Sequence, residues 1–169
     1  SGSIRVKQVT GKTEASNSGG DIKVDEAGGK LQASTSSGSI QLATVKGDIE
    51  VKNSGGGIKI GSAGGKVSVS TSSGLIQIDS VAGTELNARN SGGAIQIGRA
   101  EGTVKVQTSS GAIKVERVKG KLEARNSGGE ISVGSAQGEV MAETTSGPIK
   151  IKSAEGKVIL KNSGGSIGV

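Results

Sequence analysis

The 169-residue chain contains no Phe, Tyr, Trp, His or Cys and only one Pro and one Met. Without aromatic side chains, a spherical core cannot be filled to the density of protein interiors, so the core must be thin. The lack of His and Cys excludes thiol nucleophiles, disulfides, zinc and haem ligation and the commonest general base. The net charge is +6, and no stretch approaches the roughly 18 apolar residues that a membrane span needs.

Glycines recur every nine residues along the chain. One series runs from Gly2 to Gly83 and a second from Gly93 to Gly165. One extra residue therefore lies between the two series, near Thr84 and Glu85, and we expect it to form a β-bulge. A fixed period of this kind is typical of a repeat architecture rather than of a disordered chain.

Each nine-residue unit predicts one short strand. Apolar residues occupy the second and fourth positions after the glycine, with a mostly polar residue between them, as at 22–24, 58–60 and 113–115. Such alternation is typical of a half-buried strand. Turn residues such as Asn-Ser-Gly-Gly and Thr-Ser-Ser-Gly separate the strands, and no segment has the period of a helix.

Odd and even units differ, so one odd and one even unit together form a repeat of eighteen residues. The corner that ends each even unit is Asn and Thr in turn, which extends the full period to two of these repeats: Asn17, Thr35, Asn53, Thr71, Asn90, Thr108, Asn126, Thr144 and Asn162. Asn at such a corner is expected to bond its own turn and to accept a left-handed backbone.

Two geometries fit these periods, a two-sided coil of two units and a four-sided coil of four units. Two sheets about 10 Å apart suit Ile, Val, Leu and Ala, whereas four walls would need Phe or Trp to fill the space between them. We therefore predict an all-β, single-stranded parallel β-solenoid that is two-sided, with about 18 residues per coil. A single domain over residues 1–169, with nine to ten coils and a right hand, is expected.

The string NSGGDIKVDEAGGKLQASTSSGSIQLATVKGDIEVKNSGG, residues 17–56, resembles the bacterial adhesin family of β-solenoid domains, whose function is otherwise unassigned. The recurring phrases that carry this resemblance cover essentially the whole chain. The resemblance implies a non-catalytic structural or adhesive module of a bacterial cell envelope or surface protein, located in the envelope or outside the cell. No catalytic residue belongs to the family pattern, so none is carried over to this chain.

The outward residues of the odd units form a column without acids, which we call the Lys/Gln column: Arg5, Lys23, Gln41, Lys59, Gln77, Gln96, Lys114, Ser132 and Lys150. Many of its flanking residues are small, among them Gly57, Gly61 and Ala94. This flat face predicts a surface that binds a ligand or partner, such as a glycan or an anionic wall polymer, centred on Lys59, Gln77, Gln96 and Lys114. The alternative is a plain solvated face, as expected for the even units, whose outward charges have mixed sign.

No enzymatic activity, cofactor or metal is expected. The Ser-rich corners lack an activating base, no phosphate-binding loop is present, and the aspartates do not recur in the register of a calcium-binding repeat. Nucleic acid is not an expected partner, because bases would find no aromatic platform and 15 acidic residues are mixed with the basic ones.

No terminal caps are evident in the sequence. Residues 3–6 already fit the repeat, and the segment 165–169 stops inside a predicted strand. Repeat proteins ordinarily cover their end coils, so we expect either neighbouring domains or end-to-end self-association. Met141 and Ile159 are predicted to form an outward apolar patch on adjacent even units.

Overall fold

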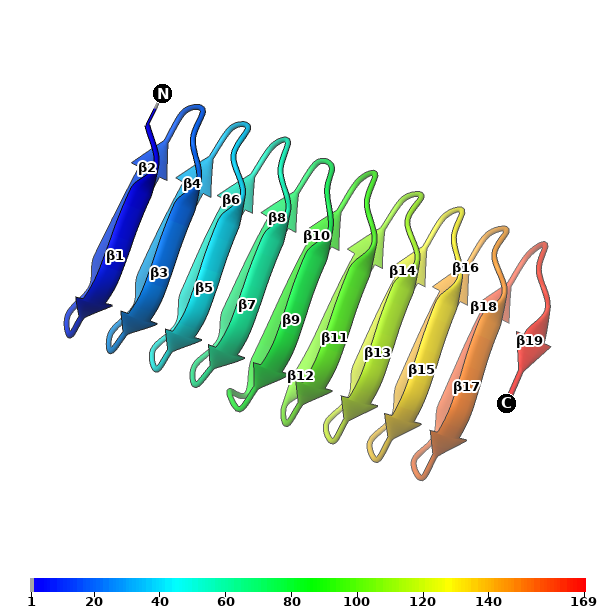
Figure 1. Ribbon diagram of the computed structural model, residues 1–169. Coiled ribbons are helices and arrows are strands. Elements are labelled where there is room, and N and C mark those ends of the chain that lie inside the picture. Colours follow the sequence, from blue (N-terminus) through cyan, green and yellow to red (C-terminus); the bar gives the residue numbers. More distant parts are fainter. Residues whose placement is uncertain (1) are drawn as a thin grey trace.

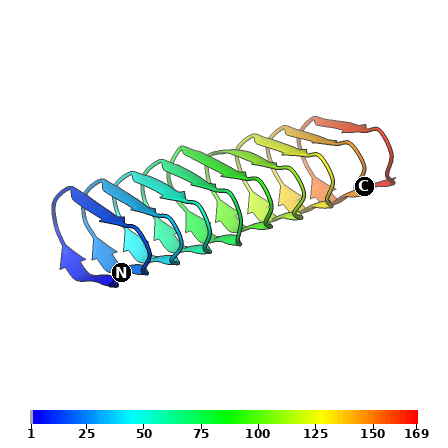
Figure 2. The same cartoon turned by 90° about the horizontal axis from the view of Figure 1, so that it is seen from above.

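A computed structural model describes residues 2–169 of the chain. The chain winds into a rod in which successive strands alternate between two facing sheets (Figure 1, Figure 2). The odd sheet contains β1 (Ile4–Val9), β3 (Ile22–Ala27), β5 (Ile40–Val45), β7 (Ile58–Ala63), β9 (Ile76–Val81), β11 (Ile95–Ala100), β13 (Ile113–Val118), β15 (Ile131–Ala136), β17 (Ile149–Ala154) and β19 (Ile167–Gly168). The even sheet contains β2 (Thr13–Asn17), β4 (Leu31–Thr35), β6 (Ile49–Asn53), β8 (Val67–Thr71), β10 (Glu85–Asn90), β12 (Thr103–Thr108), β14 (Leu122–Asn126), β16 (Val140–Thr144) and β18 (Val158–Asn162).

Neighbouring strands in both sheets are parallel, and their register follows the repeat. Ile4 pairs with Ile22, and Ile22 pairs with Ile40, so one coil takes one odd and one even unit. The predicted all-β, two-sided parallel β-solenoid is thereby confirmed, while its right hand stays a prediction. Residues 2–169 contain no helix of the length and apolarity that crossing a membrane requires.

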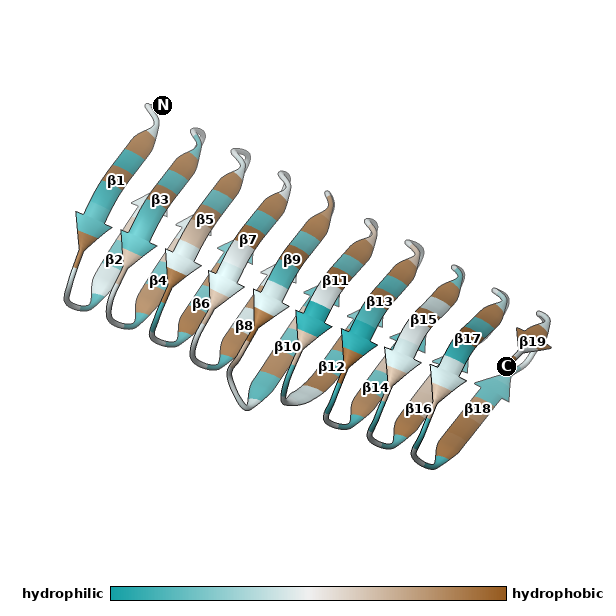
Figure 3. Ribbon diagram, turned by 60° about the horizontal axis from the view of Figure 1, so that its bottom comes forward, coloured by the Kyte–Doolittle hydropathy of each residue, from teal (hydrophilic) through white to brown (hydrophobic). Residues whose placement is uncertain are grey.

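The core is one continuous cluster of aliphatic side chains contributed by both sheets. The brown bands of Figure 3 mark the hydrophobic residues along the strands. Ile60, Ile76 and Ile78 have no exposed surface. Equivalent side chains stack directly on one another along the rod, because Ile58 pairs with Ile76 and Ile76 with Ile95. The absence of aromatic residues predicts a thin core. Two facing sheets, which pack about 10 Å apart, enclose a core of this kind.

The odd strands break the simple alternation of inward and outward residues at one place. In β7, Ile58, Ile60 and Ala63 are buried, whereas the two consecutive residues Gly61 and Ser62 face outward. The first residue of this outward pair is skipped in the ladder register of each odd strand. Each odd strand therefore bends slightly and presents two neighbouring outward columns instead of one.

Glycine recurs at both turns of the coil because successive coils stack too closely for a side chain. A Cβ atom on Gly74 would lie 2.6 Å from the carbonyl oxygen of Gly56 in the preceding coil, and one on Gly64 would lie 2.6 Å from that of Lys46. Gly74 also has a φ of 102°, in the left-handed region that glycine tolerates best.

The Asn and Thr corners from Thr35 to Thr144 are buried, and Asn17 and Asn162 are partly exposed. The sequence did not indicate this burial. Asn53 Nδ2 donates a hydrogen bond to the carbonyl of Gly38 in the preceding coil at 2.8 Å, and Thr108 Oγ1 donates to that of Gly93 at 3.1 Å. The expected bond of Asn to its own turn is confirmed, since Asn53 Oδ1 accepts from the Gly55 N–H at 3.3 Å. The expected left-handed backbone is wrong, because no residue other than glycine has a positive φ among residues 2–169.

The alternation of corners is accompanied by a difference in the contacts between coils. A turn that begins with a corner Thr has a serine just before its glycine. The hydroxyl of this serine donates a hydrogen bond to a serine carbonyl in the Asn-Ser-Gly-Gly turn of the preceding coil. Ser110 donates to Ser91 in this way at 3.3 Å, and Ser146 donates to Ser127 at 3.2 Å. The equivalent position of an Asn turn is a glycine, which has no hydroxyl to donate. The two kinds of turn therefore differ in their contacts: each of these Thr turns donates a serine hydroxyl to the preceding coil, and the Asn turns have no hydroxyl at that position.

The extra residue of the repeat lies in the connection between β9 and β10. Four residues join Val81 to Leu86, where the other coils use three. Leu86 pairs with Val67 and the register then runs without a gap to Asn90. The predicted β-bulge is wrong, because β10 pairs with β8 and with β12 without a gap in the register.

Apolar side chains are more exposed near the ends of the described rod. Ile4 and Val6 are half-buried, and Ile167 and Val169 have exposed fractions of 48% and 78%. Met141 and Ile159 pair directly across β16 and β18 and are both partly exposed, which confirms that the predicted pair lies on adjacent even strands.

Candidate binding surface

The four residues predicted to form a binding surface lie in one ladder. Lys59 pairs with Gln77, Gln77 with Gln96 and Gln96 with Lys114, across β7, β9, β11 and β13. Strands of a sheet lie about 4.8 Å apart, so the four side chains span about 14 Å along the rod. Gln77 is half-buried, and the other three are exposed.

Acidic side chains lie beside the Lys/Gln column, in the first of the two neighbouring outward columns. Glu116 Oε1 is 3.6 Å from Lys114 Nζ, and Asp79 Oδ1 accepts a hydrogen bond from Gln77 Nε2 at 3.1 Å. The expectation of small flanking residues therefore holds only for some coils. A strict alternation of inward and outward residues predicts the column that contains Asp79 and Glu116, and it does not predict the second outward column beside it.

A hollow in the odd sheet lies at Gly98, in the outward column that also contains Asp79 and Glu116. Gly98 separates Asp79 on one neighbouring strand from Glu116 on the other. The part of the hollow toward the Lys/Gln column has a volume of about 210 Å³, and the part on the other side has about 400 Å³. We call these two parts together the Gly98 hollow; Gln77, Gln96 and Lys114 line the first part, and Ser80, Arg99 and Arg117 line the second.

Arg99 and Arg117 are the functional candidates that the sequence analysis missed. They pair with each other across β11 and β13, and both side chains are exposed. Among residues 2–169, no carboxylate oxygen lies within 4.0 Å of either guanidinium. The signal was available in the register, since two arginines that are one coil apart in the sequence occupy adjacent positions in a parallel sheet.

A narrow apolar strip borders the opposite side of the Lys/Gln column. Leu75, Ala94 and Ala112 precede β9, β11 and β13, and their carbonyls accept successive ladder hydrogen bonds from the neighbouring coils. Leu75 has an exposed fraction of 38%, and the other large exposed apolar residues of the described chain lie at its C-terminal end. Across the width of the odd sheet, three kinds of side chain therefore follow one another: the apolar strip, the amides of the Lys/Gln column and the two guanidinium groups.

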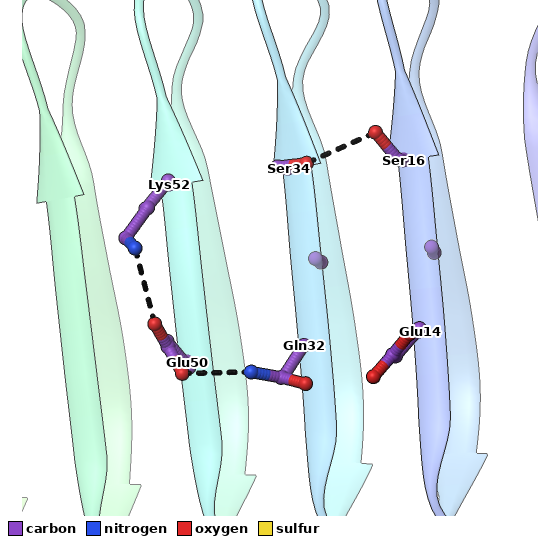
Figure 4. Close-up of a pocket in the computed structure, with 8 residues that line it drawn as sticks. Glu14, Ser16, Gln32, Ser34, Glu50 and Lys52 are labelled. Carbon is purple, nitrogen blue, oxygen red and sulfur yellow. Dashed lines mark hydrogen bonds and ion pairs between the residues drawn. The ribbon is translucent and has the colours of Figure 1, made fainter.

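The even sheet contains a second hollow, of about 250 Å³, near the start of the rod (Figure 4). Its polar groups bond mainly to one another: Gln32 Nε2 donates to Glu50 Oε2 at 2.9 Å, and Lys52 Nζ lies 3.1 Å from Glu50 Oε1. These two contacts, first the Gln32 hydrogen bond and then Lys52, hold the pKa of the Glu50 carboxyl below its ordinary value. The hollow is therefore electrostatically satisfied without a ligand.

Other charges of the even sheet are paired in the same way. Lys121 Nζ lies 3.4 Å from both Glu123 and Glu139, and the hydrogen bond to Glu123, followed by that to Glu139, raises the pKa of the Lys121 ammonium group. Paired charges that are this exposed contribute little to stability and mainly keep a surface soluble.

The chemistry available on the odd sheet is that of recognition. The Gly98 hollow offers amide, carboxylate, ammonium and guanidinium groups, which bind hydroxyls and oxyanions by hydrogen bonding and charge. No group of three or more acidic side chains is placed to hold a metal ion in the described part of the chain.

Comparison with protein families gives one match. A family model described as Toastrack DUF4097 matches residues 43–166, a range that contains β6 to β18 and the whole Gly98 hollow. Neither a curated protein nor a solved structure matches the chain.

Proposed function

Because the chain belongs to the Toastrack DUF4097 family, we propose that it is a non-catalytic structural and adhesive module of a bacterial cell envelope or surface protein. A β-solenoid of about nine complete coils suits a structural module, since its backbone ladders run from one end of the rod to the other. At about 4.8 Å per coil, the rod is about 40 Å long. A rod of this length would keep the groups that are bound at its two ends a fixed distance apart.

The observation that carries the adhesive part of the proposal is the flat odd sheet. Its Lys/Gln column forms an unbroken register from Arg5 to Lys150 and contains no acid. Such a face would lie against an extended glycan, an anionic wall polymer or another sheet. A location in the cell envelope or outside the cell belongs to the same proposal, and nucleic acid is not among the proposed partners.

A glycan- or polyanion-binding module is the second candidate function. The Gly98 hollow favours it, because amide and cationic side chains line a depression that spans three strands. In the first function the odd sheet attaches the rod to another surface, and the rod acts as a spacer. In the second function the protein's role is to bind the glycan or polyanion.

Co-sedimentation with purified bacterial envelope fragments tests the adhesive role. We expect the parent chain to sediment with the fragments and the double variant Lys59→Glu, Lys114→Glu to lose most of this binding, because it reverses two charges of the Lys/Gln column. The matched control, Lys105→Glu with Lys161→Glu, makes the same change in charge on exposed residues of the even sheet.

Thermal unfolding of each variant checks that the fold is intact. If the parent chain fails to sediment with the fragments, the proposed adhesive function is wrong. If both double variants bind as well as the parent, the odd sheet is not the contact surface.

A further inference from the structure

We propose that the Gly98 hollow and its arginine pair form a binding site for a carboxylate-bearing polysaccharide. The inference rests on the proposed binding role of the odd sheet and assigns to it a ligand class and a position. The site lies over β9, β11 and β13, where the hollow, the arginine pair and the exposed Leu75 occur together.

The arginine pair indicates an anionic ligand. Like charges at directly paired positions of a sheet are unfavourable, yet Arg99 and Arg117 occupy such positions. A second cationic pair of the odd sheet, Arg5 and Lys23, shares the carboxylate of Asp25, at 3.6 and 3.9 Å. The arginine pair has no such partner within 4.0 Å among residues 2–169.

The nearby carboxylates are engaged elsewhere. Asp79 accepts from Gln77 at 3.1 Å, Glu116 pairs with Lys114 at 3.6 Å, and Glu101 pairs with Lys119 at 2.6 Å. These contacts hold the acids toward other cations and amides. The two guanidinium groups are left open to an external oxyanion, which planar guanidinium groups bind with two parallel hydrogen bonds.

The rest of the surface fits a sugar better than a bare polyanion. Gln77 and Gln96 offer donors and acceptors for hydroxyl groups, the carboxylates of Asp79 and Glu116 accept from hydroxyls, and Leu75 supplies an apolar edge. The same two carboxylates would repel a phosphate chain that filled the hollow. A polymer with hydroxyl-rich rings and carboxylates along one edge matches this order of groups.

The site coincides with the one interruption of the repeat. The four-residue connection from Val81 to Leu86, whose last residue is the first of β10, follows β9 directly, beside Ser80 at the edge of the hollow. Insertions in repeat proteins map to loops of one face, often the binding face. The position of the extra residue is therefore an independent indication that this part of the rod binds a ligand.

Calorimetric titration of the 169-residue chain with oligogalacturonate tests the inference, with amide chemical-shift mapping by NMR to locate the ligand. We expect binding with shifts centred on β9, β11 and β13. The double variant Arg99→Gln, Arg117→Gln should bind at least about tenfold more weakly, because it removes two charge-assisted contacts. The control Arg89→Gln, Arg125→Gln removes the same charge from the even sheet and should change the affinity less than about twofold.

Two further probes separate sugar from charge. Methyl-esterified oligogalacturonate has the same rings without the charge and should bind at least about tenfold more weakly than the acid. Polyphosphate has the charge without the rings. It should bind at least about tenfold more weakly than the acid, and it should not shift the amides of residues 75–80.

The inference is overturned if oligogalacturonate does not bind, if the two arginine double variants lose affinity equally, or if either substitute probe matches the acid. Failure here is distinct from failure of the proposed adhesive function. Envelope fragments that still sediment with the parent chain would leave that function standing and remove only the ligand class assigned to it.

Discussion

At the scale of single residues, the closeness of successive coils decides which side chains are possible. Gly74 meets the preceding coil closely and has a positive φ, whereas a Cβ atom on Gly57 would have the carbonyl oxygen of Leu75 at 3.5 Å as its nearest neighbour, an ordinary contact. The two glycines therefore differ in whether a side chain could be accommodated at their position. Only the first is required by the stacking of coils.

We expect Gly74→Ala to lower the free energy of unfolding by about 1–3 kcal/mol, because the new Cβ forces both a strained φ and a displaced backbone. Gly57→Ala, the matched control, should stay within about 0.5 kcal/mol of the parent. Urea unfolding with circular dichroism detection measures both. Equal losses in the two variants would show that coil spacing does not govern the glycine columns.

At the scale of strands and turns, each corner side chain connects two coils. Asn126 Nδ2 donates to the Gly111 carbonyl at 2.7 Å, and its Oδ1 accepts from the Gly128 N–H at 3.2 Å. One amide thus satisfies a backbone group of its own turn and one of the preceding coil. Buried polar groups are tolerated here because the corner places backbone partners at the end of the core.

We expect Asn126→Ala to destabilise the chain by about 1–3 kcal/mol, since it leaves both backbone groups without their partner. Asn126→Thr should recover part of this loss, because the threonines of alternate coils donate to the equivalent glycine carbonyl, as Thr108 does to Gly93. Thermal unfolding compares the three chains. An alanine variant as stable as the parent would contradict the bridging role of the corner.

The strands themselves were predictable from the sequence because the aliphatic pattern and the glycine period agree in every coil. The burial of Asn53 was not, since residue preference alone assigns asparagine to a solvated turn, and only the fold shows that a carbonyl of the preceding coil lies within reach. The Lys/Gln column was predictable for the same reason as the strands. The importance of Arg99 and Arg117 was not seen, because the bend in each odd strand creates outward columns that strict alternation does not contain.

At the scale of the whole molecule, β1 and β2 lie at one edge of the two sheets and β18 and β19 at the other. Strands at the edge of a sheet favour pairing with a second copy of the 169-residue chain. We expect the sedimentation coefficient of the 169-residue chain to rise from micromolar to millimolar concentration. The double variant Ile167→Lys, Val169→Lys places charges on the exposed apolar end and should suppress the rise. Ser62→Lys with Ser135→Lys adds the same charge to the outward face of the odd sheet and should not.

A parent chain that sediments as a monomer throughout this range would show that its ends do not associate. Association that the control variant suppresses equally would indicate contact through the sheet faces, since that variant leaves the ends unchanged.

A chain of near-identical coils is prone to misalignment while it folds, because a strand that skips one coil still meets a partner with the same aliphatic pattern. The alternating corners oppose part of that error: a skip that stacks one Asn turn on another leaves out the Thr turn between them, and the bond of its serine hydroxyl to the preceding coil is lost. A skip of two coils restores the match, but it loops out twice as much chain, at an additional cost of about 0.6 kcal/mol. The two kinds of turn thus mark the phase of the repeat during folding, so that each strand finds its proper neighbour among many similar ones.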